Sequence, residues 1–163
     1  MKLTKRLTLI FLISFACIGC DQGTKILASN YLPKHEIYSY LNDTFRISYA
    51  ENHGAFLSLG STLSDSTRFW LLTVSVGVFL TGLFFYMIFS RKLDKPSIIG
   101  FSLMFAGGTS NLYDRAMNNG AVIDFLNLGI GSLRTGIFNI ADMYIMLGAA
   151  ILIFAHTRLQ RTS

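Results

Sequence analysis

Long stretches without a charged side chain constrain this chain more than any other feature. Residues 69–90 carry no charge over 22 positions, and residues 96–113 and 143–157 also lack Asp, Glu, Lys and Arg. A membrane-spanning helix needs about 20 predominantly apolar residues. The chain is 52% hydrophobic and 14% charged, whereas a soluble domain has about 25% charged residues. The pattern therefore predicts a protein that crosses a membrane several times.

Four spanning helices are expected within one all-α membrane domain over residues 1–163, near 7–28, 68–90, 96–115 and 137–157. The first apolar run, from Leu7 to Cys20, would form only about 21 Å of helix. The hydrocarbon core is roughly 30 Å thick, so this helix should continue through residues 21–25. Asp21 and Lys25 then lie four residues apart on one face, where they can pair.

The distribution of basic residues predicts the orientation. With both termini and the 91–95 loop in the cytoplasm, that side holds eight basic residues and one acid, Asp94. An excess of Lys and Arg marks cytoplasmic loops. The outer loops are then about 29–67 and 116–136. Runs of β-branched and aromatic residues at 37–41 and 45–50 predict a small β-rich region on the periplasmic membrane surface.

Asp124 and Asp142 are the candidate catalytic residues, and both lie near the outer ends of hydrophobic segments. An ionised carboxylate is poorly solvated in hydrocarbon, so such residues are usually functional. Two carboxyls held close together tend to share one proton, which supplies one base and one acid for activating water. The pair predicts an intramembrane aspartic peptidase.

Other polar residues near the outer side could support a site or brace the helices. Asn111, Asp114 and Arg115 follow a spacing that clusters them on about one helix face, where an Asp–Arg pair with an Asn would form a brace. Asp21 with Lys25 could equally brace the bundle or contact substrate.

Several chemistries are disfavoured. No His pair has metal-ligand spacing, so no metal site is expected. The basic residues cluster at the ends of apolar runs rather than in a stripe, which argues against nucleic-acid binding. Cys17 and Cys20 lack further ligands and are expected to be small apolar helix residues.

Five sequence blocks, in this order on a four-span frame, resemble the lipoprotein signal peptidase (signal peptidase II) family of bacterial inner membranes. They are Asp21-Gln22-Gly23-Thr24-Lys25, Asn52-His53-Gly54-Ala55-Phe56, residues 107–115 (GGTSNLYDR), residues 120–125 (GAVIDF) and Phe138-Asn139-Ile140-Ala141-Asp142. Ser110 departs from the family pattern, where Gly is commoner, and Ala55-Phe56-Leu57 stands where two alanines usually precede Phe. These departures leave the acids untouched.

The resemblance implies a catalytic pair at Asp124 and Asp142 and no cofactor. It implies supporting roles for nine further residues: Asp21, Lys25, Asn52, Gly54, Asn111, Asp114, Arg115, Asn139 and Ala141. The implied substrate is a prolipoprotein with a diacylglyceryl group on its cysteine, cut on the N-terminal side of that cysteine. Contact with membrane lipids, an active site facing the periplasm and sensitivity to the cyclic peptide globomycin follow from the same resemblance.

Two alternatives remain open at the level of sequence. The chain could be a non-catalytic four-helix membrane transporter or assembly protein, with the polar cluster binding an ion or bracing the bundle. It could also be a lipoprotein matured at Cys20, because residues 1–20 imitate a lipoprotein signal peptide.

Overall fold

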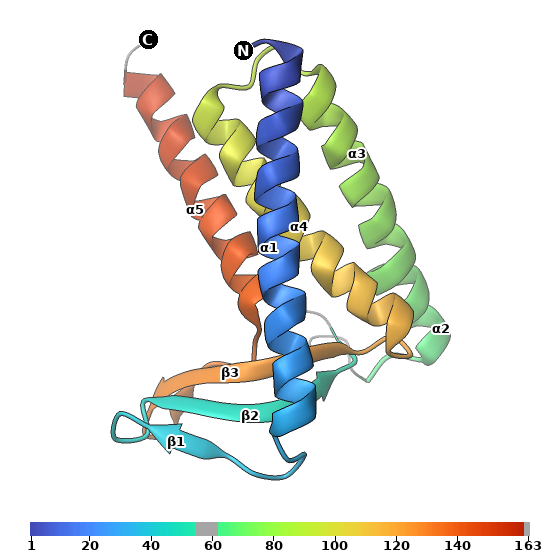
Figure 1. The fold of residues 1–163 in the computed structure, drawn as a ribbon, viewed down its shortest axis with the longest axis vertical. Helices are drawn as coiled ribbons and strands as arrows, with labels where there is room; N and C mark the ends of the chain where they lie inside the picture. Colours follow the sequence, from blue (N-terminus) through green and yellow to red (C-terminus); the bar gives the residue numbers. More distant parts are fainter. Residues whose placement is uncertain (55–61, 162–163) are drawn as a thin grey trace.

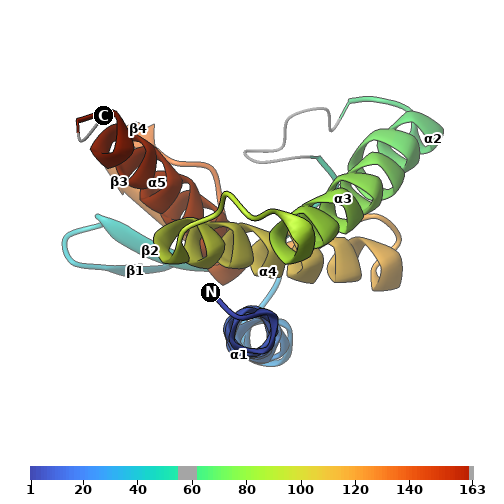
Figure 2. The same cartoon turned by 90° about the horizontal axis from the view of Figure 1, so that it is seen from above.

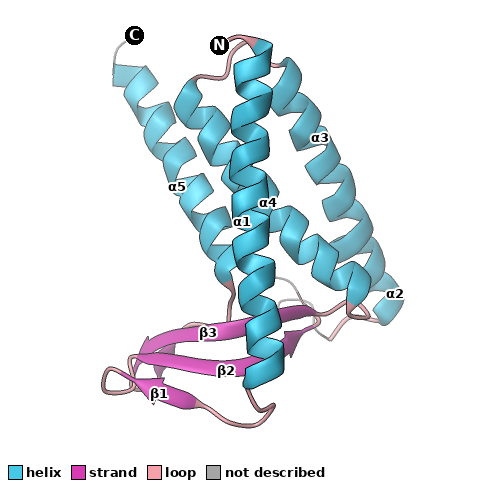
Figure 3. Ribbon diagram, in the orientation of Figure 1, coloured by secondary structure: helices cyan, strands magenta, loops and turns pink. Residues whose placement is uncertain are grey.

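The computed structural model describes residues 1–54 and 62–161. Long helices form a bundle that stands on a small antiparallel sheet (Figures 1 and 3). The helical elements are α1 (Leu3–Tyr31), α2 (Asp65–Arg68), η2 (Phe69–Val74, π-helical), α3 (Ser75–Phe89), α4 (Lys95–Met117) and α5 (Ile140–Arg161), and the strands are β1 (Tyr38–Tyr40), β2 (Phe45–Asn52), β3 (Val122–Ile130) and β4 (Leu133–Arg134). Both termini lie at the end of the bundle opposite the sheet.

Three helical segments are long and apolar enough to cross a membrane: Leu3–Tyr31, Asp65–Phe89 and Ile140–Thr157. The first confirms that the N-terminal helix continues past Cys20 and residues 21–25. The second joins α2, η2 and α3 into one continuous segment. With these spans the chain is a multi-pass membrane protein.

α4 lies at the centre of the bundle and buries several polar side chains. It packs against α1, α3 and α5, and its buried positions include Ser102, Ser110, Asn111 and Asp114. Figure 2 shows α1 on one side of α4, with α3 and α5 on the other side and diverging from each other. Neighbouring helices therefore shield the polar residues of α4 from the surroundings of the bundle.

The helix ends follow ordinary capping chemistry. At the start of α4, the side chain of Asp94 accepts a hydrogen bond from the Ser97 N–H at 2.9 Å, and Pro96 occupies the first turn. α3 ends at Phe89, and the guanidinium of Arg6 on α1 donates to the carbonyls of Met87, Ile88 and Ser90. These contacts fix the short connection between α3 and α4.

The sheet has the order β1-β2-β3-β4. The hairpin expected from residues 37–41 and 45–50 is confirmed as β1 and β2. The second outer loop, expected at about 116–136, contains the nine-residue strand β3, which was not predicted. β3 pairs with β2, with Ala50 opposite Asp124 and Asn52 opposite Val122. This pairing carries Asp124 on a strand that runs beneath the helices.

Candidate active site

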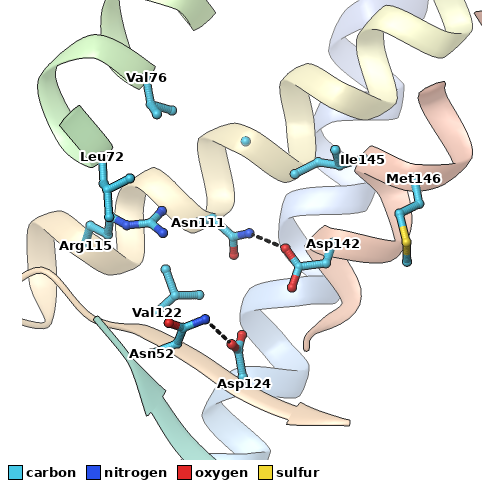
Figure 4. A pocket seen from close by; sticks show the side chains of 11 residues that line it. Asn52, Leu72, Val76, Asn111, Arg115, Val122, Asp124, Asp142, Ile145 and Met146 are labelled. Atoms are coloured by element: carbon cyan, nitrogen blue, oxygen red, sulfur yellow. Dashed lines mark hydrogen bonds between the residues drawn. The ribbon is translucent and has the colours of Figure 1, made fainter. Parts of the chain in front are cut away.

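A cavity of about 360 Å³ lies where α3 and α5 diverge over α4, next to the start of β3 (Figure 4). Asp124 and Asp142 both line it. The other lining residues are Asn52, Leu72, Val76, Gly108, Asn111, Arg115, Val122, Ile145 and Met146. The two carboxyl groups face the same space from a strand and a helix, although 17 residues separate them in the chain.

Asp142 is positioned by the first turn of α5. The N–H of Asp142 donates to Oδ1 of Asn139 at 3.0 Å, and the N–H of Asn139 donates to Oδ2 of Asp142 at 3.2 Å. This reciprocal pair is a capping box, which satisfies two backbone donors at the helix start. The side chain of Asn111 donates to Oδ1 of Asp142 at 3.0 Å. Asp142 is therefore held by two amides from α4 and from the start of its own helix.

Asp124 is positioned by β3 and is only 2% exposed. Asn52, across the strand pair on β2, donates to its Oδ2 at 2.9 Å. Asn139 donates to its Oδ1 at 2.6 Å. Phe138 makes this contact possible, because its backbone pairs with Leu126 and holds residues 138–139 against β3. Asn139 thus touches both candidate catalytic carboxyls.

Neither Asp124 nor Asp142 forms a salt bridge among the described residues; their hydrogen-bond donors are neutral amides. Burial and the neighbouring Asp142 raise the pKa of Asp124 to about 7, against the hydrogen bonds from Asn52 and Asn139, which lower it. A carboxyl with such a pKa can exchange a proton near neutral pH. The geometry suits acid–base chemistry on a bound water.

Lys25 is a buried cation that pairs with two other acids. Nζ of Lys25, whose side chain is 1% exposed, lies 2.7 Å from Asp21 and 2.8 Å from Asp114. It also donates to Oδ1 of Asn111 at 2.8 Å. That contact fixes the orientation of the Asn111 amide, so its nitrogen points to Asp142. The pairing of Asp21 with Lys25 is confirmed.

Asp114 and Arg115 do not pair with each other among the described residues, but each connects the outer end of α4 to another segment, as expected of a brace. Within the part of the chain that the structure describes, Asp114 pairs with Lys25 and accepts from the Ile123 N–H at 3.1 Å. Arg115 lies on the cavity side and donates to the carbonyl of Gly54 at 2.8 Å. Consecutive helix residues do not face each other, which explains the separation.

The remaining predicted residues join this network through hydrogen bonds of their backbone groups. Oδ1 of Asn52 accepts from the Gly54 N–H at 2.9 Å, which turns the chain at the end of β2. The Ala141 N–H donates to Oδ1 of Asp21 at 2.7 Å. Ala141 is fully buried, and its carbonyl lies where a Cβ on Gly107 would be. Residues 55–56 of the second sequence block lie outside the described residues.

Two members of the polar network were not predicted, although both stand in the recognised blocks. Ser110 is buried and donates to Oδ2 of Asp21 at 2.7 Å. Gln22 donates to the Ser110 hydroxyl at 2.9 Å and to Oδ1 of Asp114 at 2.8 Å. The departure at Ser110 therefore adds a contact between α1 and α4. Of the described residues, no three His, Cys, Asp or Glu side chains group as metal ligands.

Comparison with known proteins points to the same family as the five sequence blocks. The sequence model of the signal peptidase (SPase) II family, Peptidase_A8, matches residues 13–158. A lipoprotein signal peptidase of Chlorobium phaeobacteroides (strain BS1) is 36% identical over 161 residues, covering 92% of this chain and 96% of the relative. That of Francisella tularensis subsp. novicida (strain U112) is 34% identical over 147 residues, covering 89% of each chain.

Solved structures agree with the sequence match. One described as a bacterial membrane enzyme at 2.3 Å resolution superimposes with a TM-score of 0.79 and 27% identity, covering 94% of this chain and 89% of that one. A second, at 1.9 Å resolution, gives a TM-score of 0.74 and 26% identity, covering 90% of each chain. The family match spans most of the chain, so the protein belongs to the signal peptidase II family.

Proposed function

We propose that this membrane peptidase removes signal peptides from prolipoproteins, with Asp124 and Asp142 as a catalytic pair of carboxyls. One observation carries the proposal: both carboxyls line a single cavity and, among the described residues, accept their hydrogen bonds from neutral amides, while the buried Lys25 is paired with Asp21 and Asp114 and Arg115 donates to Gly54. A strong salt bridge to either member would favour its ionised form and hinder proton exchange. The arrangement instead keeps one proton available to the pair.

In the proposed reaction, the ionised member of the pair takes a proton from a water that attacks the scissile carbonyl. The protonated member donates to the carbonyl oxygen as negative charge develops there, and a proton then passes to the leaving amine. Because the two groups are coupled, the proton belongs to the pair during these steps. Asn52, Asn111 and Asn139 hold the carboxyls in place throughout. This aspartic mechanism needs no metal or organic cofactor.

The other walls of the cavity are suited to a lipid-modified substrate. Leu72 and Val76 lie on the side of η2 and α3, and Ile145 and Met146 lie on α5. We propose that the substrate is a prolipoprotein bearing a diacylglyceryl-cysteine and that cleavage falls on the N-terminal side of this residue. Its acyl chains would remain among membrane lipids beside the cavity. A globomycin-type cyclic peptide would compete for the same apolar walls.

We also propose the finer topology. α4 is 23 residues long, or about 34 Å, and would be a fourth span shielded by its neighbours within the single domain of residues 1–163. Both termini would lie in the cytoplasm, and the sheet and active site would face the periplasm across a bacterial inner membrane. The eight basic residues on the cytoplasmic side support this orientation. Labelling of single cysteines in the 91–95 loop and in β1 from either side of the membrane tests it.

The decisive experiment is cleavage of a diacylglyceryl-modified prolipoprotein by the purified protein in detergent. Asp124→Asn and an unmodified substrate serve as controls. The expected result is cleavage by the unaltered protein only, and only of the lipid-bearing substrate. Full cleavage by a folded Asp124→Asn variant would refute the role of the pair. Cleavage of both substrates alike would refute the lipid requirement.

A further inference from the structure

The end of the bundle that carries the termini is rich in basic residues. Six basic residues with described side chains lie there: Lys2, Lys5, Arg6, Arg91, Lys92 and Lys95. Among the described side chains, none of the six forms a salt bridge. Asp94, the acid nearest in sequence, caps the start of α4 through Ser97.

A cavity of about 500 Å³ lies within this positive region. It is lined by Met1, Leu3, Arg6, Ile88, Phe89 and Arg91. Two arginines thus meet apolar side chains in one hollow between the start of α1 and the end of α3. Leu3 and Phe89 are also exposed at the surface of the bundle, by 54% and 72%. The hollow therefore combines positive charge with surfaces suited to contact lipid chains.

Arg6 is the buried member of this pair, with 6% exposure. Its hydrogen bonds to the carbonyls of Met87, Ile88 and Ser90 all leave from Nη1, and its Nε is buried without a partner among the described residues. A guanidinium has five N–H donors and keeps its charge. Dipolar carbonyls alone compensate a buried charge incompletely. An anion beside Arg6 would supply the missing compensation.

We propose that this cavity binds the phosphodiester headgroup of an anionic phospholipid. Arg6 and Arg91 would hold the phosphate, while the acyl chains lie against the apolar surface around Leu3 and Phe89. Guanidinium groups suit phosphate oxygens because they offer paired donors. Basic pockets between helices at the cytoplasmic face are a recognised form of lipid binding. This site is separate from the cavity of Asp124 and Asp142 and does not depend on the peptidase activity.

A lipid explains the combination of arginines and apolar walls in this cavity better than a soluble anion does. Free phosphate would use the two arginines but leave the apolar walls of the cavity in contact with water. A phospholipid satisfies both parts of the site, since its charged and apolar groups are joined in one molecule. Exposed apolar side chains beside the cavity also place it at membrane depth.

Titration of the detergent-solubilised protein with phosphatidylglycerol and phosphatidylcholine, followed by native mass spectrometry, tests the proposal. Phosphatidylglycerol is expected to bind more tightly. Arg91→Ala should weaken that preference about five-fold, as expected for one basic residue near the headgroup. Lys92→Ala is the matched control. The substitution removes the same charge from the same loop, but Lys92 does not line the cavity.

The outcomes separate a built site from diffuse attraction. Equal binding of the two lipids by the unaltered protein would overturn the proposal. An equal loss in Arg91→Ala and Lys92→Ala would also overturn it, since only the total charge would then matter. Displacement of phosphatidylglycerol by excess inorganic phosphate would overturn the lipid as the occupant. Arg91 is chosen rather than Arg6 because Arg6 holds the end of α3 and its loss could unfold the protein.

Discussion

The two ends of the bundle differ in how their charged side chains are paired. At the end next to the sheet, Lys25 is buried and lies within 2.8 Å of two carboxylates, Asp21 and Asp114. At the other end, Arg91 and its basic neighbours have no acidic partner among the described side chains. Lys25 is thus engaged by other acids, and among the described residues neutral amides donate the hydrogen bonds to Asp124 and Asp142. At the second end, the charges remain available to groups outside the protein.

The largest effect is expected from removing either candidate catalytic carboxyl. Asp124→Asn and Asp142→Asn should each lower kcat/KM by at least about 10³-fold, because the pair loses its acid–base function. Cleavage of the lipid-bearing prolipoprotein measures this. Asp65→Asn removes an exposed acid near the same end and should leave kcat/KM within two-fold. Similar losses in all three variants would mean that charge at this end, rather than the pair, controls activity.

Breaking the internal pairing should cost stability. Lys25→Met leaves Asp21 and Asp114 buried without a cation, which should lower the free energy of unfolding by about 3–5 kcal/mol. Chemical denaturation in detergent measures the change. Lys34→Met is the matched control, because Lys34 pairs with Glu51 at the surface and little change is expected. Equal stability of the two variants would contradict the contrast between buried and exposed pairs.

α4 packs closely on α5 at both ends of the bundle, so matched glycine variants can test the two ends independently. A Cβ at Gly107 would meet the Ala141 carbonyl and Ile145, near the catalytic pair, whereas a Cβ at Gly100 would meet the Gly148 carbonyl at 2.9 Å nearer the termini. Gly107→Ala and Gly100→Ala should each cost about 1–3 kcal/mol of stability. Only Gly107→Ala should also lower kcat in the folded fraction, because it displaces Asp142. Gly82→Ala, with open space around its Cβ, is the neutral control.

The pH dependence should report the environment of Asp124. Its folded-state pKa of about 7 lies above the ordinary value of 3.8, so the folded protein holds this proton more tightly than the unfolded chain. The contribution to stability is therefore full below pH 3.8 and declines as the pH rises to about 7. Activity should fall above about pH 7 as the pair loses its shared proton.

Asn52→Ala sharpens the pH prediction, since it removes a hydrogen bond that lowers the pKa of Asp124. The alkaline limb of the kcat/KM profile should move to higher pH. A profile that stays in place, or moves to lower pH, would show that Asp124 does not control that limb.

The smallest effect is expected at the end that carries the termini. Asp94→Ala removes the cap of α4 and should lower stability by about 1 kcal/mol. Thermal unfolding measures this, and kcat/KM of the folded protein should not change. A loss of several kcal/mol would mean that Asp94 also compensates the basic residues around it.

The elements that depend on residues close together in the sequence were the ones predicted. The length of the apolar run predicted that α1 continues through Lys25, and the aromatic runs predicted β1 and β2. Strand β3 was missed because its stability comes from pairing with β2, at least 70 residues earlier in the chain. Likewise, the partner of Asp114 comes from α1, which spacing within α4 could not reveal.

The sequence named the residues of the candidate site better than it predicted the contacts between them. Family resemblance named the asparagines, and the expense of a carboxylate in hydrocarbon singled out Asp124 and Asp142. The orientation of each amide depends on contacts between separate elements, such as Lys25 with Asn111 or Asn139 with Asp124. Ser110 was taken as a departure from the family pattern, yet its hydroxyl joins the network because the helices approach closely there.

The divergence of α3 and α5 over α4 has a consequence for how substrates arrive. A cavity that lies between two membrane helices receives molecules that diffuse within the plane of the bilayer. The rate of encounter then depends on the number of prolipoproteins per unit area rather than per unit volume. Diluting the substrate with additional lipid at constant bulk concentration should therefore slow its cleavage.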